Sequence, residues 1–219
     1  GISSNFIETK GFTRINIKLT TDTETEINSQ SSKVSEENIK DFFASLDELN
    51  SDDTVFLSGN IIPGMESDDF VKIAEKIRQK GANLVVDSNK DMVLDTLKYV
   101  PFIVKPNEFE LAEMFGVEIN TVKDIVKYAR KLQKMGAKNV LVSRGSKGAI
   151  LFAENGKVFS ANIAKGKVVS TIAAGDSMLA MFVAKYDETG DYKLSLQYAS
   201  AAGGATSFSA GVGKKELIE

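Results

Sequence analysis

The sequence predicts an α/β domain of three layers, in which helices cover both faces of a mostly parallel β-sheet. Short, continuous apolar runs, such as residues 84–86 and 140–142, are typical of strands that are buried on both faces. Between these runs lie segments whose apolar residues recur at helical spacing, as in residues 122–132. Strands that alternate with helices in this way form parallel sheets.

The chain opens with a different pattern. Residues 12–19 alternate strictly between apolar and polar, which places Ile15, Ile17 and Leu19 on one face. This alternation predicts a half-buried strand whose other face is polar and partly cationic. A second short strand is expected at residues 25–28.

From residue 36 onward, the pattern predicts helices and buried strands in turn. We expect helices at residues 36–49, 67–80, 92–97, 122–132, 176–186 and 194–209, and strands at residues 54–57, 84–86, 102–104 and 140–142. Ser67 is the expected cap of the second helix. The Asn155-Gly156 pair, flanked by residues 149–152 and 157–163, predicts an antiparallel hairpin.

Composition excludes several kinds of chemistry. The 219 residues include no Cys, His or Trp, so the chain cannot form a disulfide, a Cys/His zinc site or a His-dependent triad. Acid–base work must then fall to Asp, Glu, Lys or Tyr. A net charge of -3 with interspersed signs argues against a nucleic-acid partner. No apolar run approaches the ~20 residues of a membrane span, so we expect a cytoplasmic protein with no membrane partner.

The strongest signal for chemistry lies just before the helix predicted at residue 176. Ala173, Ala174 and Gly175 are small enough for the backbone to turn closely around a ligand, and the first N–H groups of a helix carry partial positive charge. Asp176 follows directly, where the helix terminus stabilises a carboxylate. The segment predicts an anion hole beside a carboxylate base. Simple capping by Asp176 explains the local pattern equally well.

A second candidate site stands between a buried strand and a helix. Lys105, Asn107 and Glu110 lie at the carboxyl end of the strand, where open parallel sheets bind ligands. Asn107 and Glu110 are three residues apart, so both would face the same side, and their oxygen atoms suit Mg²⁺. A capped helix with a solvated Glu is the alternative interpretation.

Ser143, Gly145 and Gly148 form a third candidate, because they follow a buried strand and can present backbone N–H groups to phosphate. Their spacing is not that of a P-loop, and an ordinary loop before the hairpin is the alternative. Asn60 follows another buried strand and would line a substrate pocket or a plain connection. Gly203 lies in a helical pattern, where glycine allows close approach of another helix or of a flat ligand such as adenine.

In their order and wording, these segments resemble the PfkB carbohydrate kinases of the ribokinase-like fold. Residues 13–18 and 199–206 are similar in particular to the branch that holds bacterial 1-phosphofructokinases and tagatose-6-phosphate kinases. The resemblance covers nearly the whole chain and is carried by Thr13-Arg14-Ile15-Asn16, Ser58-Gly59-Asn60, Lys105-Pro106-Asn107 with Glu110, Ser143-x-Gly145-x-x-Gly148 and Ala173-Ala174-Gly175-Asp176.

The resemblance implies an ATP- and Mg²⁺-dependent kinase that converts fructose 1-phosphate to the 1,6-bisphosphate. Asp176 would take the proton from the sugar hydroxyl, and residues 173–175 would form the anion hole. Arg14 would pair with the phosphate already on the sugar, for which a guanidinium fork is well suited. Asn60 would contact the sugar, although the family often has serine there.

The resemblance also implies a nucleotide site. In it Lys105 would meet the nucleotide phosphates, Asn107 and Glu110 would help to hold Mg²⁺ through water, Ser143, Gly145 and Gly148 would line the phosphate and ribose region, and Gly203 would lie near the adenine. Phosphoryl transfer by positioning and charge neutralisation suits a site without histidine.

Three departures from the family pattern stand out. Ala173 replaces the first glycine of the family's Gly-Ala-Gly-Asp core, and Met181 stands where the family has a small residue. The opening strand and the Gly-rich stretch that holds the sugar are not found, so roughly a quarter to a third of a family-length chain is expected to be missing.

The predicted organisation is a part of a β lid at residues 1–28 and a ribokinase-like core at residues 29–219. The resemblance implies that this lid covers the sugar and joins two subunits, so a homodimer is expected; an exposed strand edge would otherwise be an aggregation liability. Alternatives are a kinase for tagatose 6-phosphate or fructose 6-phosphate, and a non-catalytic remnant that binds sugar phosphate or nucleotide. A dinucleotide-binding enzyme ranks low because no G-x-G-x-x-G follows a strand.

Overall fold

Six strands form the central sheet in sequential order, from β3 at one edge to β8 at the other. The computed structural model describes residues 2–20 and 24–218. Strands β3 to β6 are parallel, and the last two neighbour pairs, β6–β7 and β7–β8, are antiparallel. The strands are β3 (Thr54–Gly59), β4 (Asn83–Ser88), β5 (Ile103–Val104), β6 (Asn139–Ser143), β7 (Ala149–Phe152) and β8 (Val158–Ala161).

Helices cover both faces of this sheet, which confirms the predicted three layers. Five of them, α1 to α5, lie on one face, and α6 and α7 pack together on the other. The helices are α1 (Glu36–Ser45), α2 (Ser67–Gln79), α3 (Lys90–Thr96), α4 (Glu108–Phe115), α5 (Val122–Met135), α6 (Ala174–Thr189) and α7 (Tyr192–Ser207). Short 3₁₀ helices occupy Leu46–Glu48, Leu97–Tyr99, Gly145–Lys147 and Lys215–Leu217.

Alternation along the strands divides the core between the two faces. Val85 and Ile103 are fully buried beneath α6 and α7, whereas Val86 and Val104 are buried among α1 to α5. Side chains two residues apart share a face of a strand. The residues that follow Val85 and Ile103 by two positions therefore point toward α6 and α7, and this parity decides which polar side chains meet at the carboxyl edge.

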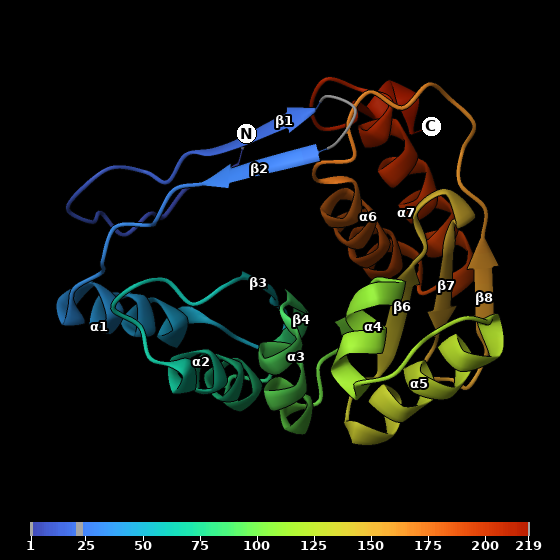
Figure 1. Cartoon of the computed structure of the whole chain (residues 1–219). Coiled ribbons are helices and arrows are strands. Elements are labelled where there is room, and N and C mark those ends of the chain that lie inside the picture. The colour runs from blue at the N-terminus through green and yellow to red at the C-terminus, as the bar shows by residue number, and fades with distance from the viewer. Residues whose placement is uncertain (1, 21–23, 219) are drawn as a thin grey trace.

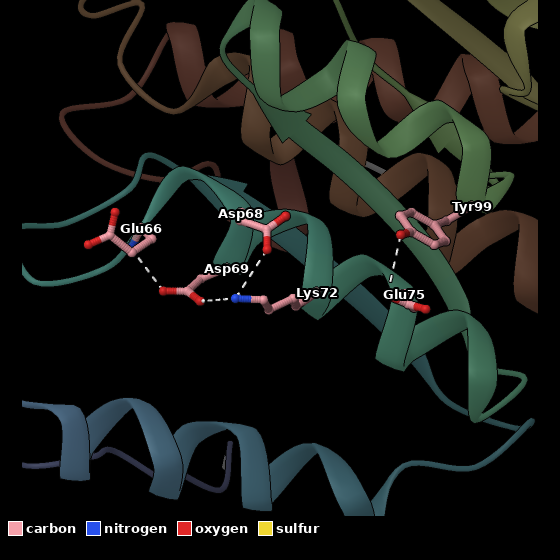
Figure 2. A network of polar contacts seen from close by, with 6 residues as sticks. All are labelled: Glu66, Asp68, Asp69, Lys72, Glu75 and Tyr99. Atoms are coloured by element: carbon pink, nitrogen blue, oxygen red, sulfur yellow. Dashed lines mark hydrogen bonds and ion pairs between the residues drawn. The ribbon is translucent and has the colours of Figure 1, made fainter.

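The start of α2 differs from the prediction, because Ser67 is its first helical residue and Glu66 is the N-cap. Figure 2 shows the reason: the Asp69 carboxylate accepts a hydrogen bond from the Glu66 backbone N–H at 2.9 Å. Lys72 Nζ lies 3.1 Å from Asp68 and 3.2 Å from Asp69, one turn along the helix. Acidic groups in the first turn are favoured by the helix dipole, so Asp69 stabilises a start that a serine hydroxyl was expected to cap.

A hairpin of β1 (Asn16–Thr20) and β2 (Glu24–Asn28) forms a sheet of its own, set apart from the central sheet in Figure 1. The predicted strand at residues 12–19 was too long at its beginning. Its apolar face was also expected to be the buried one, but Ile17 and Leu19, like Ile27 on β2, are each about half exposed. A two-stranded sheet has no second layer of its own, so one apolar face stays at the surface.

Candidate active site

A polar cavity of about 500 Å³ lies at the carboxyl edge of the parallel strands. The residues at this edge are Ser58 in β3, Asp87 in β4 and Lys105, which directly follows β5, and strand register aligns Ser58 with Asp87. Open parallel sheets bind ligands at this edge, because helix N-termini and loops converge there. The other lining residues are Gly59, Asn60, Ser88, Asn89, Glu110 and Asp176.

An ion pair between Asp87 of β4 and Lys105, directly after β5, lines this cavity. Lys105 Nζ lies 3.1 Å from Asp87 Oδ2, and both side chains are largely buried, at 9% and 18% exposure. Burial raises the pKa of the Asp87 carboxyl above its ordinary value; the Lys105 ammonium opposes this rise, and the charge of Asp176 adds to it. The two carboxylates and the ammonium therefore act on one another electrostatically within a single site.

The N-terminus of α6 faces the same cavity. Its N-cap, Ala173, has φ +59° and offers no side-chain cap. The Ala174 N–H donates to Thr171 at 3.3 Å, while in the described part of the chain the N–H groups of Gly175 and Asp176 donate to no acceptor. The expected free N–H groups at this helix start are thus present, and such groups carry partial positive charge; binding of an anion by them stays a prediction.

Gly175 has a close neighbour in this site. A Cβ added to it would lie 3.0 Å from Lys105 Nζ, so the absence of a side chain lets the ammonium approach the helix start. The φ of Gly175 is not positive. The requirement for a small residue here thus comes from Lys105, whereas at Ala173 it comes from the left-handed backbone conformation.

Asn107 and Glu110 form a reciprocal capping box at the start of α4. Asn107 Oδ1 accepts from the Glu110 N–H at 2.8 Å, and Glu110 Oε2 accepts from the Asn107 N–H at 2.7 Å. The capping interpretation is therefore confirmed. It leaves the second carboxylate oxygen of Glu110 for other partners, and Glu110 also lines the cavity. The structure thus allows Glu110 both to cap the helix and to bind a ligand.

The loop after β6 lies beside the α4 start, because Ser143 bridges to Asn107 in parallel register. Arg144 Nε donates to Glu108 at 2.8 Å, which fastens the loop to α4. The two loop glycines differ. A Cβ on Gly148 would lie 2.0 Å from the Ala161 carbonyl oxygen, while Gly145 has open space around it. Gly148 is needed for packing against β8, and Gly145 leaves room for a ligand.

The remaining predicted residues lie in different surroundings. Asn60 lines the cavity, and its Oδ1 accepts from Asn89 Nδ2 at 3.0 Å. Arg14 is exposed on the segment before β1 and is not among the residues that line the cavity. Gly203 is buried, with the Ala174 carbonyl 3.2 Å from where its Cβ would be. Gly203 thus lets α7 approach the first turn of α6.

Asp87, Ser88 and Asn89 belong to the cavity but were missed by the sequence reasoning. A signal was present, since Asp87 directly follows the buried run at residues 84–86. The rule that singled out Lys105, a polar residue at the carboxyl end of a buried strand, applies equally to Asp87. Its partner Lys105, directly after β5, becomes clear only from strand register.

The donors of the site fit ATP and Mg²⁺. Free N–H groups and a buried ammonium suit phosphate, and Glu110 supplies a carboxylate oxygen of the kind that Mg²⁺ prefers. Among the described residues no group of three or more acidic side chains could hold a metal ion. Mg²⁺ commonly binds through one or two carboxylates together with substrate phosphates, so such a site needs the nucleotide to complete it.

None of the described helices is long and apolar enough to cross a membrane.

Comparison with known proteins agrees with this geometry. The family model for pfkB family carbohydrate kinases matches residues 1–217. A 1-phosphofructokinase of Bacillus subtilis is 39% identical over 218 residues, a match that covers 100% of this chain and 72% of the relative. A D-tagatose-1-phosphate kinase of Bacillus licheniformis is 34% identical, with the same two shares covered. The chain therefore belongs to the pfkB family of carbohydrate kinases, which transfer phosphate from ATP to a sugar hydroxyl.

Solved structures show the same fold. A crystal structure described as a phosphofructokinase from Staphylococcus aureus superposes with a TM-score of 0.87 and 36% identity, over 99% of this chain and 71% of that one. The ribokinase of Arabidopsis thaliana superposes with a TM-score of 0.69 at 22% identity, over 90% and 64%. The predicted ribokinase-like fold is confirmed.

Proposed function

We propose that this chain phosphorylates fructose 1-phosphate to fructose 1,6-bisphosphate, with ATP as the phosphoryl donor. The observation that carries the proposal is the meeting of Asp176, Lys105 and the free N–H groups of α6 at one cavity. These groups supply a carboxylate, a cation and an anion hole, which phosphoryl transfer requires. The 1-phosphofructokinase of Bacillus subtilis supports the choice of substrate.

In the proposed reaction, the sugar hydroxyl oxygen attacks the γ-phosphorus, and the bond to the β–γ bridging oxygen breaks as ADP leaves. Asp176 accepts the hydroxyl proton. The N–H groups of Gly175 and Asp176 face the transferred phosphoryl group, and Ala173 and Ala174 shape the turn around it. Lys105 neutralises negative charge on the phosphates. Preorganised donors of this kind act where charge develops in the transition state.

The other predicted residues keep their proposed roles. Asn107 and Glu110 would help to hold Mg²⁺, which would neutralise phosphate charge. For the nucleotide, Ser143, Gly145 and Gly148 would line the phosphate and ribose region, and Gly203 would lie near the adenine. Toward the sugar phosphate, Asn60 would contact the sugar, and Arg14 would pair with the existing phosphate.

A second candidate substrate is D-tagatose 1-phosphate, which the name of the Bacillus licheniformis relative indicates. Both relatives are named for sugars phosphorylated at carbon 1, which favours a 1-phosphate over tagatose 6-phosphate or fructose 6-phosphate. Arg14 would pair with the phosphate of each of these sugars and so does not discriminate among them.

We propose that residues 1–28 are part of a lid over the sugar and that residues 29–219 are the kinase core. The exposed apolar face of the hairpin supports a homodimer formed through this lid, since Ile17 and Ile27 stand opposite each other on it. Removing such a face from water would stabilise the dimer. We place the enzyme in the cytoplasm, where its co-substrate ATP is available.

The test is turnover of this chain with ATP, Mg²⁺ and each of the four sugar phosphates, compared with Asp176→Asn. Loss of the base is expected to lower kcat by about a hundredfold or more. Asp187→Asn is the matched control, because it makes the same change on the exposed far end of α6. Turnover of Asp176→Asn within about tenfold of the unaltered chain would remove Asp176 as the base. No turnover with any sugar would favour the non-catalytic alternative.

A further inference from the structure

The parity of β4 and β5 directs Asp87 and Lys105 to one side of the sheet. Val86 and Val104 are register partners, so the residues after them stand side by side at the carboxyl edge. Both lie two positions beyond side chains that are buried beneath α6 and α7. Asp87 and Lys105 therefore point toward the N-terminus of α6, where the free N–H groups are.

The Lys105 ammonium has two close neighbours there. Asp87 Oδ2 lies 3.1 Å from Nζ, and the position of a Cβ on Gly175 lies 3.0 Å from the same atom. With its side chain only 9% exposed, the lysine stem is held by packing, and the ammonium sits between a carboxylate and a bare α carbon. This is a defined position for a side chain that has four rotatable bonds when free.

A carboxylate beside a phosphate-binding lysine weakens the attraction of that lysine for an anion. Asp87 also experiences the charge of Asp176, and its own burial is unfavourable for the charged form. The negative charge of Asp87 therefore does not strengthen the binding of an anion by Lys105. What Asp87 does supply is orientation, because an ion pair holds the ammonium at one point of the cavity.

Building on the proposed function, we propose that Asp87 is a positioning residue for phosphoryl transfer, which holds the Lys105 ammonium against Gly175 at the start of α6. The Lys105 side chain is then already held in one conformation, so its ammonium is in place when negative charge develops on the transferred group. Misplacement of a group by about 1 Å can cost a hundredfold in rate. Positioning of this kind raises kcat and does not increase the affinity for ATP in the ground state.

The test is Asp87→Asn, which keeps the shape of the side chain and removes its charge. We expect kcat to fall by at least about fivefold, because the Lys105 ammonium is no longer held in position. KM for ATP should stay the same or decrease, because the Asp87 charge no longer weakens the attraction between Lys105 and the phosphates. Asp91→Asn is the matched control: Asp91 pairs with Lys90 at 3.8 Å on the exposed surface of α3 and should leave both constants unchanged. Thermal melting of each variant checks the fold.

The same substitution in a Lys105→Met background separates positioning from other roles. If Asp87 acts through the ammonium, Asp87→Asn should change kcat by less than about twofold once the ammonium is gone. A smaller fall than fivefold in the single variant, a raised KM for ATP, or full additivity in the double variant would overturn the proposal. An inactive unaltered chain would instead count against the proposed function.

Gly175→Ala gives a second route, should Asp87→Asn fail to fold. The added methyl would lie 3.0 Å from the ammonium and must displace it by a few tenths of an ångström. Alanine is a good helix former, so this variant should fold. The same pattern is expected, with kcat lowered and KM for ATP not raised; an unchanged kcat would contradict the proposal.

Discussion

Replacing Ala173 by glycine should stabilise the protein. Ala173 is the N-cap of α6 and holds φ +59°, a left-handed conformation that costs a residue with a Cβ about 1–2 kcal/mol. Glycine adopts this conformation without that cost but loses about 0.4–1 kcal/mol through the greater freedom of the unfolded chain. The difference between these terms predicts a gain of up to about 1.5 kcal/mol for Ala173→Gly.

Urea unfolding followed by circular dichroism measures this gain directly. For a domain of this size, each 1 kcal/mol corresponds to a rise in Tm of about 2–4 °C. Catalysis should be retained, because the free N–H groups proposed to face the phosphoryl group belong to Gly175 and Asp176 and not to Ala173. The slope of the free energy against urea should stay the same, since the surface exposed on unfolding is unchanged.

Ala174→Gly is the matched control, one residue further along. Ala174 is the first residue of α6 and has no positive φ, so glycine there brings only the entropic cost, up to about 1 kcal/mol of destabilisation. Opposite signs for the two neighbouring substitutions are the expected result. If Ala173→Gly lowers the stability as Ala174→Gly does, the left-handed conformation is not a source of strain and the reasoning is wrong.

Three further predictions concern the surroundings of the site. Asn107→Ala removes the cap of α4 and should cost about 1 kcal/mol in urea unfolding, whereas Asn107→Asp, which keeps an acceptor, should cost less. Gly148→Ala should destabilise by more than about 2 kcal/mol in the same assay because its Cβ would overlap the Ala161 carbonyl, while Gly145→Ala meets no neighbour and should cost only its positive φ. Gly203→Val should force α7 away from α6, which is expected to lower the free energy of unfolding by about 1–3 kcal/mol and with it the Tm. An unchanged Tm would show that the two helices can separate freely.

Most of the central sheet could be predicted from the sequence because its strands are short apolar runs between amphipathic helices. Each run became a strand, and the hairpin at the Asn-Gly turn was also confirmed. These elements depend on local periodicity, which a single sequence displays. The errors lie where local pattern was weak or misleading: Glu66 caps α2 in place of Ser67, and β1 begins at Asn16.

The start of α6 illustrates how far sequence reasoning reaches into the site. A small-residue turn before a helix, followed by Asp176, pointed to free N–H groups, and the structure has them. Asn107 and Glu110 were open to two interpretations. The structure confirms the cap between them, and the spacing that suggested metal ligands is the same spacing that makes a capping box.

Sequence was enough to predict the parallel α/β sheet and the turn of small residues before α6, because both depend on residues that are neighbours along the chain. The carboxylate base in a chain without histidine, and the binding of an anion at that turn, stay predictions. Only the tertiary structure decided that Asp87 pairs with Lys105 and that Gly175 must lack a side chain for Lys105 to reach the helix start. Those contacts join β4, β5 and α6, whose positions follow from strand register and packing and not from local pattern.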